Sequence, residues 1–157
     1  MALNVLWLQS GGCGGCSMSL LCDDTADFPA RLKAAGVHLL WHPSLSLESG
    51  HELMALLDDC LEGRQRLDVL CIEGALLRGP QGSGRFHLLA GTGLPMTQWV
   101  RRLAGVARHV LAVGSCAAWG GVSATGANPT EACGLQYEDE HRGGLLGSDF
   151  RARGGLP

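Results

Sequence analysis

The chain has 157 residues, of which 46% are hydrophobic and 17% charged, and its formal net charge is −3. This length suits one domain whose core is large enough to be stable without disulfide bonds. The negative net charge disfavours nucleic acid as a partner. No apolar run reaches the ~18–20 residues of a membrane span. The start "MALNVLWLQS" lacks a secretory leader, so a cytoplasmic location is expected.

Apolar runs and segments with helical spacing alternate along the chain. Four apolar runs are predicted to form strands, at residues 3–8, 37–41, 67–74 and 109–121. Helices are predicted over residues 17–36, with an interruption near Pro29, and over 49–63 and 95–108. Residues 78–93 read as a glycine-rich loop, and loops are also predicted after 121. This order predicts one α/β domain over 1–157, with an open parallel sheet and helices on both faces.

Three of the predicted strands end in small residues or in an acid, in segments 9–15, 73–74 and 114–116. Because the carboxyl ends of parallel strands share one edge of the sheet, these segments are expected to lie together where such folds bind ligands. The side chains expected to meet there are Cys13, Cys16, Glu73 and Cys116.

The spacing Cys13-Gly14-Gly15-Cys16 allows several chemistries. Nucleotide binding lacks support, because neither G-x-G-x-x-G nor Gly-Lys-Ser/Thr occurs in the chain. A redox dithiol would leave Cys116 without a role, and a zinc site is disfavoured because the sequence holds only one C-x-x-C pair. An iron–sulfur cluster fits best, since C-x-x-C supplies two thiolates and the flanking glycines admit backbone N–H groups to the sulfurs.

Four stretches resemble the small subunit of nickel–iron hydrogenases: "LWLQSGGCGGCSMSLL", "IEG" at 72–74, "GSCAAWGGV" at 114–122 and "NPT" at 128–130. The resemblance is to the cytoplasmic branch, which comprises hydrogen-sensing and uptake enzymes. It implies a flavodoxin-like, electron-transferring domain that holds the proximal 4Fe-4S cluster. The expected partner is a large subunit carrying the Ni-Fe centre, in a heterodimer or a higher oligomer, with a histidine kinase as a further partner of a sensor.

The resemblance also implies roles for single residues. Cys13, Cys16 and Cys116 would be cluster thiolates, and Glu73 would serve in hydrogen bonding or proton movement near the cluster. The family's fourth thiolate lies in a Gly-Cys-Pro segment, which is expected beyond Pro157, with Cys133 as an internal substitute. Further iron–sulfur clusters are expected only in a full-length small subunit, which adds a C-terminal cluster domain.

Two other functions remain open at this point. A flavodoxin-like interaction module with an incomplete cluster would have the same strand pattern but no enzymatic role. The related iron–sulfur subunit of respiratory complex I typically carries an adjacent Cys-Cys pair, which is absent here.

Overall fold

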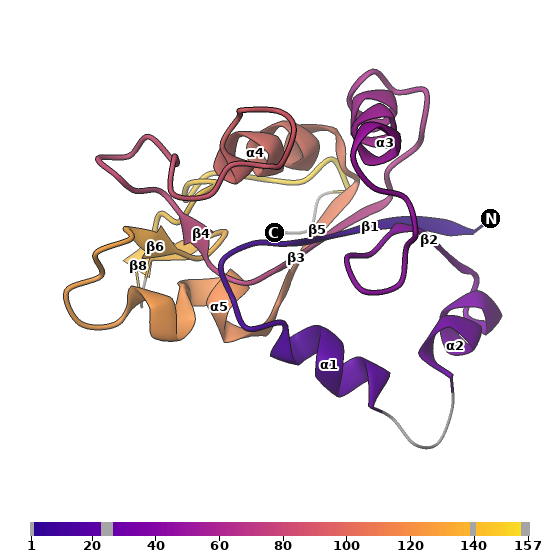
Figure 1. Ribbon diagram of the computed structural model, residues 1–157, viewed down its shortest axis with the longest axis horizontal. Coiled ribbons are helices and arrows are strands. Elements are labelled where there is room, and N and C mark those ends of the chain that lie inside the picture. Colours follow the sequence, from indigo (N-terminus) through magenta and orange to yellow (C-terminus); the bar gives the residue numbers. More distant parts are fainter. Residues whose placement is uncertain (1, 23–26, 139–140, 155–157) are drawn as a thin grey trace.

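A four-stranded parallel sheet forms the centre of the computed structural model, which describes residues 2–22, 27–138 and 141–154 (Figure 1). Its strands are β1 (Leu3–Gln9), β2 (Val37–Trp41), β3 (Val69–Glu73) and β5 (His109–Val113), in the order β2-β1-β3-β5. This order matches the first four strands of the flavodoxin-like arrangement. The predicted α/β class with an open parallel sheet is confirmed.

Helices cover both faces of this sheet (Figure 1). On one face lie α3 (His51–Leu61) and α4 (Met96–Val106), and on the other lie α1 (Gly15–Leu21), α2 (Phe28–Ala34) and α5 (Gly114–Trp119). A 3-10 turn, η1 (Gly121–Ala124), follows α5. Two short antiparallel pairs complete the described part: β4 (Leu76–Leu77) with β6 (Ala132–Cys133), and β7 (Tyr137–Glu138) with β8 (His141–Arg142).

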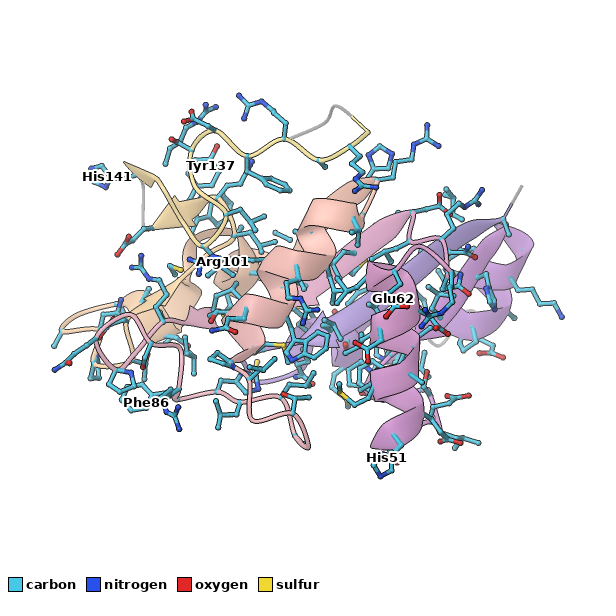
Figure 2. All side chains as sticks on the ribbon, turned by 90° about the horizontal axis from the view of Figure 1, so that it is seen from above. His51, Glu62, Phe86, Arg101, Tyr137 and His141 are labelled. Carbon is cyan, nitrogen blue, oxygen red and sulfur yellow. The ribbon has the colours of Figure 1, made fainter. Side chains whose placement is uncertain are left out.

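The main core lies between the sheet and the α3–α4 layer. Alternate strand residues such as Leu6, Leu70 and Ile72 are fully buried against Leu57 of α3 and Leu103 of α4. Seen from above, α4 lies beside α3, and Arg101 on α4 donates to the carbonyl of Leu145 at 3.2 Å (Figure 2). The alternation that buries one set of strand residues here directs the intervening set to the opposite face.

One expectation about local structure requires correction. The strand predicted over 109–121 ends at Val113, and the residues from Gly114 onward form α5, so Cys116 lies on a short helix. Gly114 has a φ of +81°, a value that a strand interior does not allow and that glycine adopts without steric cost. The interruption expected near Pro29 lies just before it: α1 ends at Leu21, and Pro29 is in the first turn of α2, where its missing N–H costs nothing.

The predicted helical segments over 17–36 are therefore two helices, and residues 23–26 lie outside the described part of the chain. The glycine-rich segment 78–93 contains no helix or strand, as predicted. Within the described residues, no helix combines the length and the apolar character needed to cross a membrane.

Candidate functional site

Two glycine-containing loops meet where β1 and β3 end. The register of the sheet pairs Gln9 with Glu73, so both strands stop at the same level. Beyond them, Gly11 and Ala75 exchange two backbone hydrogen bonds, of 2.9 and 2.7 Å. A Cβ atom on Gly12 would lie 3.0 Å from the Cα of Gly74, so a larger residue would push the loops apart. Glycine is needed here because backbone packs directly on backbone.

A third segment reaches the same edge from β5. A Cβ atom on Gly114 would lie only 2.4 Å from the Sγ of Cys16, so this thiol rests on the turn that ends β5. Cys116 follows two residues later, and its own Sγ is 2.6 Å from the position that a Cβ on Gly121 would take. The structure thus brings Cys16 and the Cys116 segment together, although a hundred residues separate them.

The thiol of Cys13 also lies at this edge of the sheet, near Cys16. Cys13 is exposed, and its sulfur accepts the N–H of Gly15 at 3.4 Å. Burial raises the pKa of the Cys16 thiol, and negative charge on Glu73, Cys116 and Cys13 raises it further. The effect of Cys13 and Cys116 on Cys16 indicates that the three thiols lie near one another at this edge, and bound iron would offset the charge of their thiolates.

Glu73 is a buried acid behind these thiols, with 2% of its surface exposed. Its carboxylate accepts the indole N–H of Trp7 at 3.1 Å, the backbone N–H of Ser17 at 3.1 Å and the hydroxyl of Ser17. Burial by itself raises the pKa of Glu73, but the hydrogen bonds from Ser17, Trp7 and the Cys16 backbone outweigh it and lower the pKa overall. The carboxylate is therefore held in its ionised form.

Sequence reasoning missed two members of this site, Ser17 and His42. The Oγ of Ser17 lies 3.2 Å from the Nε2 of His42, a fully buried residue whose ring tilts over that of Trp7 at 5.0 Å between centroids. The available signal was the His42-Pro43 pair that directly follows β2, because β2 ends at the same sheet edge as β1 and β3.

The remaining four cysteines lie elsewhere. Cys133 is fully buried, and its thiol faces the carbonyl of Leu76 at 3.7 Å. Burial raises the pKa of Cys60 to about 11 and that of Cys71 to about 12, as expected of thiols packed in the core. Cys22 is exposed at the end of α1.

The donor set suits a multi-iron cluster better than a single ion. Across the described residues, no three His, Cys, Asp or Glu side chains are close enough to share one metal ion. A single zinc ion needs every sulfur about 2.3 Å from the same centre, whereas each thiolate of a cluster binds a different iron and the sulfurs stand farther apart. Cysteine thiols with hydrogen-bond donors beside the sulfurs are the donor type of a 4Fe-4S cluster, so the residues at this edge are of the kind that would hold one.

The chain is similar to known proteins along most of its length. Residues 13–149 match the family described as NADH ubiquinone oxidoreductase, 20 Kd subunit. The Hydrogenase-2 small chain of Escherichia coli K12 is 34% identical over 134 residues, which cover 84% of this chain and 34% of that protein. The F420 non-reducing hydrogenase II small subunit of Methanosarcina mazei is 30% identical over 152 residues, covering 88% and 36%.

Solved structures of hydrogenases are also similar to this chain. The actinobacterial-type NiFe-hydrogenase from Ralstonia eutropha H16 superposes with a TM-score of 0.79 at 30% identity, covering 99% of this chain and 46% of that one. A reduced, active Ni-Fe-Se hydrogenase from Desulfomicrobium baculatum gives a TM-score of 0.73 at 27% identity, covering 86% and 50%. This chain spans 34–36% of the length of the two curated relatives described above.

Proposed function

The chain belongs to the NADH ubiquinone oxidoreductase 20 kDa subunit family, in its nickel–iron hydrogenase small-subunit branch, and on that premise we propose that it transfers electrons for such a hydrogenase. In this proposal Cys13, Cys16 and Cys116 bind the proximal 4Fe-4S cluster. The observation that carries the proposal is the contact of the Cys16 thiol with Gly114, which joins the C-x-x-C loop to the segment that holds Cys116.

When bound, such a cluster supplies one-electron transfer. The residues of this chain hold it and set its surroundings. Glu73 keeps a fixed negative charge behind Cys16, and the thiol-bearing loops present glycine backbone to the sulfurs. Because Glu73 accepts hydrogen bonds from both Trp7 and Ser17, the geometry favours a hydrogen-bonding role for this acid over proton movement.

The surface around the thiols supports docking of a partner subunit. Large apolar side chains on the elements next to the cysteines are exposed: Met18 and Leu20 on α1 at 55% and 37%, Trp119 on α5 at 49% and Val122 on η1 at 84%. Exposed apolar groups of this kind mark contact surfaces when they cluster. We propose that the large subunit, with its Ni-Fe centre, covers this face and delivers electrons from hydrogen oxidation.

The fourth thiolate is proposed to come from polypeptide that follows residue 157. The N–H of Gly154 donates to the carbonyl of Arg108 at 2.6 Å, immediately before β5 begins. The described chain therefore ends beside the start of β5, the strand that leads to the Cys116 segment. Cys133 is the weaker candidate, because its buried thiol already faces a backbone carbonyl.

The proposal is tested by expressing the protein together with a hydrogenase large subunit under anaerobic conditions. We expect bound iron, acid-labile sulfide and a spin signal of the reduced cluster. Cys13→Ser and Cys116→Ser should lose this cluster, whereas Cys22→Ser, a matched change of an exposed cysteine, should keep it. Retention of normal iron and sulfide by the first two variants would refute the ligand assignment.

Location and physiological role form a separate proposal. We place the assembled protein in the cytoplasm, because all seven cysteines are free thiols and reduced cysteine is typical of that compartment. Fractionation of cells that make the native protein tests this, and recovery with periplasmic markers would contradict it. Hydrogen-dependent phosphorylation of a co-expressed histidine kinase would assign sensing, and rapid dye reduction would assign hydrogen uptake.

A further inference from the structure

A chain of hydrogen bonds links β2 to the site through buried polar groups. The N–H of Ser44 donates to Nδ1 of His42 at 3.0 Å, and Nε2 of His42 lies 3.2 Å from Oγ of Ser17. The hydroxyl of Ser17 in turn donates to Glu73. His42 is 0% exposed and Ser17 3%, so water cannot replace these partners.

The partners fix the position of the proton on His42. A backbone N–H can only donate, so Nδ1 of His42 must be an acceptor and carry no proton. A neutral imidazole with a bare Nδ1 carries its proton on Nε2, which then donates to the hydroxyl oxygen of Ser17. The imidazolium form is excluded, because its Nδ1 proton would point at the N–H of Ser44.

This proton position determines how Ser17 is oriented. With one lone pair of its oxygen occupied by His42, the single hydroxyl proton of Ser17 is directed to Glu73. The backbone N–H of Ser17 donates to the other carboxylate oxygen of Glu73 at 3.1 Å. Ser17 is thus held at both its backbone and its side chain, and it is the residue next to Cys16.

We propose that His42 is a positioning residue: as a neutral imidazole protonated on Nε2, it orients Ser17 and thereby fixes the Glu73 carboxylate and the backbone beside Cys16. The consequence for electron transfer rests on the proposed function, in which Cys16 is a cluster ligand. A carboxylate fixed at this position disfavours addition of an electron to the cluster. Release of this carboxylate should make the midpoint potential of the cluster less negative.

The first test measures the proton position directly and needs no cluster. NMR of the full chain labelled with 15N-histidine should show His42 as the neutral Nε2–H tautomer at pH 7. In Ser17→Ala, which removes only the hydroxyl, this preference should weaken because Nε2–H loses its acceptor. An Nδ1–H tautomer or an imidazolium in the unsubstituted chain would overturn the proposal.

The second test separates positioning from packing. His42→Gln keeps one donor and one acceptor, whereas His42→Phe keeps an aromatic ring against Trp7 but no polar atom. We expect the Ser17 amide signal to shift in His42→Phe and to return toward the native position in His42→Gln. The opposite order, with a native signal in the phenylalanine variant, would overturn the proposal.

In the protein assembled with its large subunit, the midpoint potential and the spin signal of the reduced cluster should follow the same order. His42→Phe should give a less negative potential, and His42→Gln should stay near the native value. If no cluster binds, the proposed function fails while the tautomer measurement still decides the role of His42. Equal potentials in both variants and the native protein would overturn the effect on the cluster.

Discussion

Replacing Gly114 with alanine is expected to disrupt the thiol site by more than backbone strain alone. Gly114 has a φ of +81°, and an alanine held in this left-handed region costs roughly 1–2 kcal/mol. In addition, the new Cβ would lie 2.4 Å from the Sγ of Cys16, well inside the ~3.5–4 Å of an ordinary contact. The Cys16 thiol must therefore move by roughly 1 Å or more. Rotation about χ1 of Cys16 would achieve this by turning the thiol away from Gly114.

Gly63→Ala provides a matched control. Gly63 follows α3 with a φ of +77°, and a Cβ there would meet nothing within 4 Å. Both variants should lose a similar ~1–2 kcal/mol of unfolding free energy from strain. Only Gly114→Ala should lose its thiol geometry.

Two measurements separate these effects. Urea unfolding of each full chain gives the change in free energy, and iron with acid-labile sulfide in the assembled protein gives cluster content. We expect Gly63→Ala to bind iron normally and Gly114→Ala to bind little. Native iron content in Gly114→Ala would show that the Cys16 thiol does not need the space above Gly114, which would refute the reasoning.

Three further outcomes are expected. At pH 8, Cys71, with its pKa raised to about 12, should react with iodoacetamide far more slowly than exposed Cys22, because little of its thiol is ionised and reagent cannot reach it; similar rates by mass spectrometry would contradict its burial. Leu57→Ala should cost about 2–5 kcal/mol in urea unfolding, because the side chain is fully buried; a loss below ~1 kcal/mol would argue against the packing of α3 on the sheet. Burial lowers the pKa of His42 below 6.5, although Glu73 opposes this shift. As the pH falls, His42 therefore gains a proton in the unfolded chain before it does so in the folded chain. The free energy of unfolding should therefore decrease as the pH drops below 6.5. His42→Gln should remove part of this pH dependence but not the part due to His87, whose pKa is also lowered by burial. An unchanged pH dependence in His42→Gln would contradict the shift of His42.

The sequence alone determined the layer arrangement and the location of the site. Continuous apolar runs such as 69–73 suit only strands that are buried on both faces, and helical spacing between the runs requires parallel connections. Parallel strands then bring Cys13, Cys16, Glu73 and the Cys116 segment to one edge, whatever the details of the loops. The iron–sulfur chemistry proposed for this edge rests on residue type, because C-x-x-C supplies two thiolates and glycine lets backbone N–H groups approach the sulfurs.

The tertiary structure decided what depends on exact contacts between distant residues. The His42-Pro43 pair after β2 places His42 at the sheet edge, but it does not indicate that the ring meets Ser17, 25 positions earlier, because that contact arises only when β2 and α1 pack together. Likewise, the helical setting of Cys116 depends on the backbone angle at Gly114, and the burial of Cys133 depends on the pairing of β6 with β4. Periodicity reports the face on which a side chain lies, whereas hydrogen-bond partners are set by distances of a few ångströms that only the folded chain fixes.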